Sequence, residues 1–155
     1  MIVGVATLGP LGRLKAPGTW GSAAGLVWWL FVVRPLTQGK ALGHEVAFDL
    51  LVLLAAVCFC GAAAALIGRK DPPEVILDEF ACMPLVFVGL RSFDPGWLVA
   101  GFLLFRLLDI TKPFGIRRLE SLPWGIGIVA DDLVAALLAN GVLHVAQVFL
   151  PTLLG

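Results

Sequence analysis

Acidic residues stand beside or within the apolar segments of this chain. Asp78-Glu79, Asp109 and Asp131-Asp132 each adjoin or interrupt a long apolar run. A carboxylate near hydrocarbon is disfavoured by roughly 2.5 kcal/mol or more. A chain that keeps such groups needs a cation or a basic partner to hold them. Carboxylate oxygens are the ligands that Mg²⁺ prefers, so these residues predict a metal site in a membrane enzyme.

A further acidic residue precedes the first acidic pair. Asp71-Pro72-Pro73-Glu74 has the pattern of a helix start, with Asp as the cap and Pro in the first turn. A gap of seven residues on a helix returns nearly to the same face, so Asp71 and Asp78 are expected to line one groove; a plain capping role is the alternative for Asp71. The candidate metal ligands are Asp71, Asp78, Glu79, Asp131 and Asp132.

Arg106, Asp109 and Lys112 are spaced by three residues, which places them on one face of a helix. Arginine suits bidentate contact with phosphate, and lysine offers a point charge. The alternating charges would keep Asp109 ionised without bulk water. The spacing indicates a phosphate-binding face, and the alternative is a structural ladder of ion pairs that ties down the helix end.

The pair Asp131-Asp132 follows Gly127 and begins the last apolar run. Adjacent carboxylates repel each other unless a cation or a basic group lies between them. We therefore expect one of the two to face the acidic pair across the bundle. The other would cap a helix or meet a basic residue, and either could serve as a general base.

The segment from Lys15 to Ser22 is rich in small residues and leads into the first apolar run. Backbone N–H groups at a helix start can hold an anion, which makes Lys15, Thr19 and Ser22 candidate substrate-binding residues. The segment lacks the GxxxxGK[ST] pattern of a Walker loop. An ordinary helix start is the alternative interpretation.

The composition of the chain indicates the kind of fold that must position these residues. The chain has 155 residues, 59% of them hydrophobic, with a mean hydropathy of +0.97 and a net charge of zero. These values predict one integral-membrane domain, residues 1–155, and no binding to nucleic acid; they leave the oligomeric state open. The expected fold is all-α, a polytopic membrane bundle. The expected spans are Trp20–Val33, Leu50–Ile67, Phe80–Leu90, Trp97–Leu108 and Leu133–Leu150.

The distribution of Lys and Arg predicts the orientation in the membrane. With five spans, eight basic residues fall on one side and three on the other, and the richer side is the cytoplasmic one. The acidic residues lie on that same side. The expected orientation in the membrane therefore has the site facing the cytoplasm.

The chain resembles the phosphatidylglycerophosphatase A family. Four motifs occur in the family's order, each weak alone and specific together. Trp124, Gly115, Cys82 and Ala136 depart from the usual family residues, but none of them replaces a charged group. The motifs are Ala16–Ser22; Asp71-Pro72 with Asp78-Glu79-Phe80; Phe105–Ile110 with Lys112-Pro113-Phe114 and Ile116-Arg117; and Gly127-Ile128 with Asp131-Asp132.

The resemblance implies a Mg²⁺-dependent hydrolase that removes the terminal phosphate of phosphatidylglycerophosphate. The products would be phosphatidylglycerol and inorganic phosphate, a step of phospholipid biosynthesis. Family relatives that are soluble are compact bundles of about six helices, one of them central, so we expect five to six helices here. The implied catalytic residues are Asp78, Glu79, Asp109, Asp131 and Asp132, and the implied phosphate-binding residues are Arg106 and Lys112 beside Lys15, Thr19 and Ser22.

Two other functions fit parts of the pattern. Carboxylates inside a membrane can form the path of an ion- or proton-coupled transporter, but that function requires polar residues across the whole membrane depth. Another metal-dependent lipid phosphate-transfer enzyme, such as a CDP-alcohol phosphotransferase, would need a DGxxAR signature, which this chain lacks.

Overall fold

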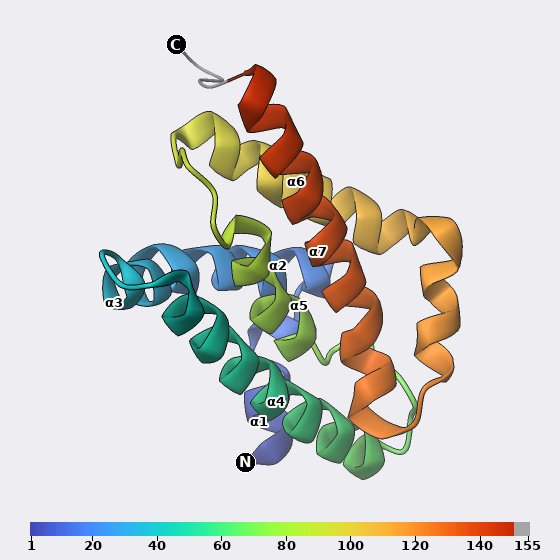
Figure 1. The fold of residues 1–155 in the computed structure, drawn as a ribbon. Coiled ribbons are helices and arrows are strands. Elements are labelled where there is room, and N and C mark those ends of the chain that lie inside the picture. The colour runs from blue at the N-terminus through green and yellow to red at the C-terminus, as the bar shows by residue number, and fades with distance from the viewer. Residues whose placement is uncertain (151–155) are drawn as a thin grey trace.

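The computed structural model describes residues 1–150, and all regular structure within that range is helical (Figure 1). The all-α prediction is confirmed. Short 3₁₀ segments cover Leu11–Arg13, Met83–Phe87 and Pro113–Ser121, and a π-helical turn covers Trp29–Val33. The α-helices are α1 (Ile2–Ala6), α2 (Pro17–Trp28), α3 (Arg34–Thr37), α4 (Leu42–Ile67), α5 (Leu77–Cys82), α6 (Pro95–Thr111) and α7 (Trp124–Phe149).

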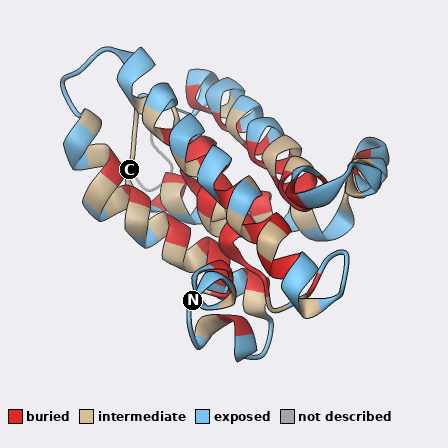
Figure 2. Cartoon of the chain, turned by 90° about the horizontal axis from the view of Figure 1, so that it is seen from below, coloured by how far each residue is buried: buried red, intermediate tan, exposed pale blue. Residues whose placement is uncertain are grey.

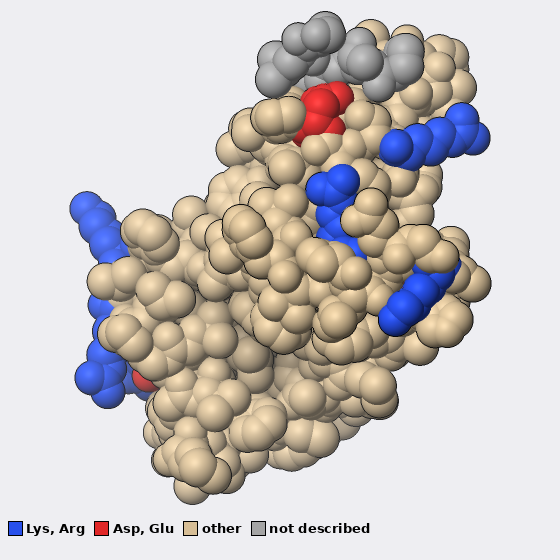
Figure 3. Space-filling view, turned by 90° about the vertical axis from the view of Figure 1, so that its left-hand side faces the viewer, with Lys and Arg blue, Asp and Glu red and all other residues tan. Residues whose placement is uncertain are grey.

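Helices α4 and α7 are the longest, with 26 residues each, and both are apolar enough to cross a membrane. They approach each other closely where α4 ends and α7 begins (Figure 1). Glycine makes this approach possible, because a Cβ atom on Gly125 would lie 1.9 Å from the carbonyl oxygen of Val57. Figure 3 shows one face of the molecule with a broad uncharged area bordered by basic side chains.

The centre of the bundle is the short helix α5 together with the 3₁₀ segment that follows it. Helix α5 packs against α2, α4 and α7, the 3₁₀ segment packs against α2, α6 and α7, and buried residues gather in the interior (Figure 2). Cys82, Met83 and Phe87 are fully buried. The expected span Phe80–Leu90 is therefore wrong: its residues form a broken segment inside the protein. The expectation of one central helix surrounded by the others is confirmed.

The remaining expected spans are also shorter or less regular than a membrane helix. Trp20–Val33 lies in α2 and the π-helical turn, where the hydrogen-bond pattern changes before α3. Trp97–Leu108 lies in α6, whose 17 residues extend about 26 Å at 1.5 Å per residue. Within residues 1–150, only α4 and α7 have the length and composition of a span. The length and composition of the helices thus support two spans directly, and the spans at Trp20–Val33 and Trp97–Leu108 stay predictions.

Polar residues of α7 hold the end of the central segment in place. Asn140 Nδ2 donates to the carbonyl oxygens of Val86 and Val88, at 3.1 and 2.9 Å. Gln147 Oε1 accepts a hydrogen bond from the backbone N–H of Arg91 at 3.0 Å. The broken segment cannot satisfy these backbone groups itself, and unsatisfied polar groups are costly in an apolar interior. The polar residues in the outer half of α7 therefore have a structural role.

Candidate functional site

Four stretches of chain that are distant in sequence meet at one pocket of about 270 Å³. They are the start of α2, the start of α5 with the loop before it, the end of α6, and the third turn of α7. The backbone around Gly18 forms part of its wall. Most of the predicted site residues line this pocket: Asp71, Asp78, Glu79, Arg106, Asp109, Lys112, Asp131 and Asp132.

Asp78, Glu79 and Asp132 form a cluster of carboxylates in the pocket. One oxygen from each lies within 4.8 Å of the other two. The first turn of α5 supplies Asp78 and Glu79, and α7 supplies Asp132. Asp78 and Asp132 are buried. Each of the three has a buried oxygen without a hydrogen-bond partner among residues 1–150: Asp78 Oδ1, Glu79 Oε2 and Asp132 Oδ2.

The electrostatics of this cluster call for a cation. Burial raises the pKa of Asp78 well above its usual range, and the nearby charges of Glu79 and Asp132 raise it further. Three converging carboxylates with unpartnered oxygens fit the oxygen ligands that Mg²⁺ takes, with the remaining positions left to water or phosphate. The residues present therefore fit the metal that the sequence pattern predicts.

Arg106 lies at the edge of the carboxylate cluster, on α6. Its Nη1 is 2.5 Å from Asp109 Oδ2 and 3.9 Å from Glu79 Oε1. The same nitrogen donates to the hydroxyl of Ser22 at 3.4 Å, and that hydroxyl donates to the carbonyl oxygen of Gly18. Asp109 and Ser22 together fix the direction of the guanidinium. Arg106 is thus a cation held at the pocket wall, as expected for a phosphate-binding group.

Lys112 does not share the helix face of Arg106 and Asp109 that its spacing suggested. It ends α6 in a left-handed conformation, with φ of 43°. Its ammonium group binds Asp131 and, at 2.7 Å, Glu120 Oε1. Burial alone would lower the pKa of Lys112, but these two hydrogen bonds outweigh it and raise the pKa above its ordinary value. The ammonium group therefore stays charged at neutral pH.

The two adjacent carboxylates of α7 point to different partners. Asp132 joins the cluster with Asp78 and Glu79, and Asp131 pairs with Lys112. This is the division that repulsion between neighbouring carboxylates led us to expect. Helix α7 begins at Trp124, so both residues lie in its third turn and Gly127 lies inside the helix. Asp131 Oδ1 is buried and has no hydrogen-bond partner in the described residues.

Asp71 lines the pocket from a loop and not from a helix. The expected helix start at Asp71 is wrong, since α5 begins only at Leu77. Residues 68–76 instead form an irregular connection, and Asp71 is exposed at the rim of the pocket. Lys15 and Thr19 are exposed and do not line the pocket. Of the three residues predicted in the first motif, only Ser22 contacts the site, through Arg106.

Two residues of the site were not predicted from the sequence. Glu120 binds Lys112 across eight residues of irregular chain, and no local spacing could have indicated that contact. Gly18 stands so close to Glu79 that a Cβ atom on it would lie 2.3 Å from Oε1. The run of small residues that contains Gly18 was a usable signal, because a close backbone approach requires them.

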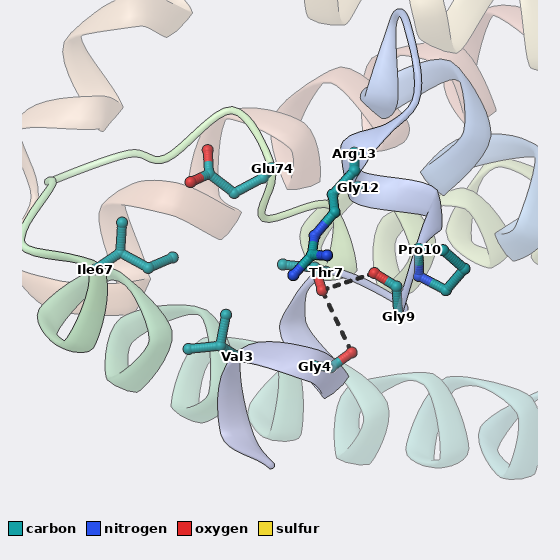
Figure 4. Close-up of a pocket in the computed structure, with 9 residues that line it drawn as sticks. All are labelled: Val3, Gly4, Thr7, Gly9, Pro10, Gly12, Arg13, Ile67 and Glu74. Atoms are coloured by element: carbon teal, nitrogen blue, oxygen red, sulfur yellow. Dashed lines mark hydrogen bonds between the residues drawn. The ribbon is translucent and has the colours of Figure 1, made fainter.

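A larger cavity, of about 730 Å³, lies elsewhere, between α1, the first 3₁₀ segment and the end of α4 (Figure 4). Its charged lining residues are Arg13 and Glu74. Thr7 points into it, but its hydroxyl already donates to the carbonyl oxygens of Gly4 and Gly9. This cavity has no group of converging carboxylates, so its size does not make it the site of chemistry.

Comparison with known proteins agrees with this geometry. A family model described as Phosphatidylglycerophosphatase A matches residues 4–147. Phosphatidylglycerophosphatase A of Haemophilus influenzae is 35% identical over 139 residues, covering 85% of this chain and 79% of the relative. The Escherichia coli protein of the same name is 33% identical over 132 residues, covering 83% and 72%.

A Bacteroides thetaiotaomicron protein provisionally named phosphatidylinositol-3-phosphatase is 29% identical over 134 residues, covering 85% of this chain and 84% of the relative. No solved structure matches the chain. The relatives are lipid phosphatases, and the matched region includes the acidic and basic residues that form the pocket. The chain belongs to the phosphatidylglycerophosphatase A family and is a hydrolase of phosphoric monoesters.

Proposed function

We propose that this chain is a Mg²⁺-dependent phosphatidylglycerophosphatase. It would hydrolyse the terminal phosphate of phosphatidylglycerophosphate to give phosphatidylglycerol and inorganic phosphate. The proposal depends on one observation: Asp78, Glu79 and Asp132 form a cluster of carboxylates with unpartnered oxygens. The side chains of Arg106 and Lys112 line the same pocket, each paired with an aspartate. The names of the two most similar relatives reported above support the choice of lipid.

The three clustered carboxylates would hold the metal. A bound Mg²⁺ polarises phosphoryl oxygens and lowers the pKa of a bound water. Asp71 lies at the rim, where it is available as a further ligand for the metal or its water. Asp109 and Asp131 lie outside the cluster, because each is engaged by a basic side chain.

The basic residues would bind the phosphate. Arg106 is aimed by Asp109 and Ser22, so its guanidinium is positioned before substrate arrives. Charge grows on the phosphoryl oxygens during transfer, and preorganised cations stabilise that charge most effectively in a site with little water. Lys112 would act in the same way from the opposite side, between Asp131 and Glu120.

A carboxylate near the phosphate would accept the proton of the attacking water. Asp131 is our candidate, because its Oδ1 is free while Lys112 binds its other oxygen. Asp132 lies in the carboxylate cluster and is better placed to hold the metal. A general base must lie within hydrogen-bond reach of the water it activates, and Asp131 lines the same pocket.

The site would face the cytoplasm, at the level of the lipid headgroups of a bacterial inner membrane. The pocket lies near the end of α4 and the start of α7, the two candidate spans, and not midway along them. Arg69 and Lys70 follow the end of α4, and Arg117 and Arg118 precede the start of α7, and such a concentration of basic residues favours the cytoplasmic side. The acyl chains of the substrate would remain in the bilayer while the headgroup reaches the carboxylates.

The transporter alternative receives no support from the polar residues of α7. Asn140 and Gln147 bind backbone groups that follow the central segment, and His144 Nε2 lies 3.1 Å from the carbonyl oxygen of Val88. These side chains are occupied in holding the fold. They do not extend the acidic pocket into a path across the bundle.

The decisive assay uses purified protein in detergent, with phosphate release measured from phosphatidylglycerophosphate, phosphatidic acid and phosphatidylinositol 3-phosphate. We expect release from the first lipid to depend on Mg²⁺ and to stop with EDTA. Equal activity in EDTA would remove the metal from the proposal. Preference for one of the other lipids would assign the same site to a different lipid phosphate.

A further inference from the structure

A groove on the surface leads toward the carboxylate pocket. It has a volume of about 260 Å³ and runs between the end of α4 and the start of α7. Gly61 and Ala64 of α4 line it together with Trp124 of α7, and Arg69 and Lys70, which follow α4, line it as well. The Trp124 ring rests on Gly61, since a Cβ atom there would lie 2.5 Å from the indole.

The groove and the carboxylate pocket are joined by a small cavity of about 10 Å³. This cavity shares Lys70 and Trp124 with the groove, and it shares Asp71 and Ile128 with the carboxylate pocket. Its volume is about that of one water probe, so a larger group would have to displace a side chain. Lys70 is exposed and forms no ion pair within residues 1–150, which leaves it free to move.

Basic side chains occur both in the groove and in the carboxylate pocket. Arg69 and Lys70 make the groove basic, and Arg106 and Lys112 place further cations in the carboxylate pocket. Phosphatidylglycerophosphate carries two phosphates, an inner diester and a terminal monoester, separated by a glycerol. A ligand of that kind needs two cationic positions with a short polar connection between them.

The groove also has the surroundings that a lipid requires. It lies at the ends of the two helices that are apolar enough to cross a membrane. Small residues line it on α4, and the apolar side chains of Leu66, near the end of α4, and Ile126, near the start of α7, are exposed. The half-exposed Trp124 has the amphipathic character typical of residues at the headgroup level.

We propose that this groove binds the inner phosphodiester of the substrate through Arg69 and Lys70, while the terminal phosphate occupies the carboxylate pocket. The glycerol would cross the small cavity beside Lys70, and the acyl chains would follow α4 into the bilayer. The inference rests on the proposed function. It assigns to Arg69 and Lys70 the selection of a lipid that carries a phosphodiester next to its phosphomonoester.

The test compares two double variants that each remove two exposed positive charges. Arg69→Ala with Lys70→Ala changes the groove, and Arg13→Ala with Arg118→Ala changes basic residues that do not line it. On phosphatidylglycerophosphate in mixed micelles, we expect the groove variant to raise KM about tenfold with kcat within twofold of wild type. The control variant should change neither constant by more than twofold.

Product inhibition gives a second measurement. Phosphatidylglycerol keeps the phosphodiester and lacks the monoester, so it should compete with substrate in the wild type and in the control variant. The groove variant should lose most of this competition. Elution of each variant as a single species from size-exclusion chromatography in detergent shows that the fold is kept.

The outcomes separate the two proposals. If the wild type releases no phosphate from phosphatidylglycerophosphate, the proposed function fails and this inference fails with it. If the wild type is active and both double variants behave alike, the proposed function stands and the groove is not the diester site. An equal rise of KM in both variants would assign the effect to attraction of the micelle surface.

Discussion

The Cβ position of Gly18 lies 2.3 Å from Glu79 Oε1 and 3.0 Å from Arg106 Nη2. The start of α2 therefore presses its backbone against the carboxylate and the cation that define one side of the pocket. A methyl group at this position would have to push both side chains away. The contact joins the glycine-containing first motif to the acidic and basic motifs in physical terms.

Gly18→Ala is expected to lower phosphate release by at least tenfold while the protein stays folded. The added methyl displaces the flexible end of Glu79 and not the backbone, so most of the cost falls on the site. The measurement is kcat/KM together with the thermal midpoint. Gly141→Ala is the matched control, because a Cβ atom there meets nothing within 4 Å. Equal activity of the two variants would contradict the close contact.

Removal of one clustered carboxylate should abolish activity. Asp78→Asn, Glu79→Gln and Asp132→Asn each remove a charge from the cluster and are expected to reduce phosphate release by roughly 100-fold or more. The same variants should lose the rise in thermal midpoint that Mg²⁺ gives to the wild type. Glu74→Gln is the control, since Glu74 is acidic but does not line this pocket. Full activity in all three variants would rule out a metal site here.

Lys112→Met is expected to reduce both stability and activity. The substitution keeps the length of the side chain but leaves Asp131 and Glu120 without their cation. Breaking a buried ion pair by removing one partner typically costs about 3–5 kcal/mol, and partial exposure of Glu120 places this pair at the lower end. Lys112→Arg should retain more stability than Lys112→Met in thermal unfolding. The reverse order would show that the ammonium group contributes little.

Stability of the metal-free protein should fall as pH rises. The raised pKa of Asp78 means that the folded state favours its protonated form. Such a group stabilises the fold fully below the unfolded pKa, about 4, and the contribution is lost as pH rises through the folded pKa. We therefore expect the thermal midpoint in EDTA to be lower at about pH 8 than at about pH 5. A larger stabilisation by Mg²⁺ at the higher pH would support this, and a pH-independent effect would oppose it.

Asn140→Ala should destabilise the fold without affecting the chemistry. Asn140 Nδ2 donates hydrogen bonds to the carbonyl oxygens of Val86 and Val88. Loss of a donor to buried acceptors costs about 1–3 kcal/mol. The measurement is the denaturation midpoint in detergent, with kcat determined for the folded fraction. Val142→Ala, at an exposed position of the same helix, controls for the change to alanine. A loss of kcat with unchanged stability would give Asn140 a role in the reaction.

The all-helical fold and most of the pocket follow from the sequence, because the acidic residues stand where helices begin or end. Carboxylates beside apolar runs must be brought together or paired, and this constraint predicted that one of Asp131 and Asp132 would join Asp78 and Glu79; the structure shows that it is Asp132. The central segment could not be predicted in the same way. The composition of an apolar run such as Phe80–Leu90 does not show whether lipid or protein surrounds it. In this fold, other helices enclose it.

The contacts that sequence spacing did not predict join residues that are far apart in the chain or are connected by an irregular segment. Lys112 leaves the helical register because it ends α6 in a left-handed conformation, and Phe114 and Gly115 then turn the chain. Glu120 reaches it only through that turn. Likewise, the partner of Val88 is Asn140, 52 residues away. Periodicity describes neighbours within one helix, and it carries no information on such pairs.

The pocket takes its walls from both ends of the chain, beginning near Ala16 and ending at Asp132. During synthesis, α5 therefore emerges with Asp78 and Glu79 long before α7 can bring Asp132 to them. A truncated polypeptide that lacks α7 lacks Asp132 of the carboxylate cluster and keeps only Glu120 as a partner for Lys112. Under the proposed function, hydrolytic competence would thus be acquired only at the last stage of translation, and an unfinished chain would not dephosphorylate lipids.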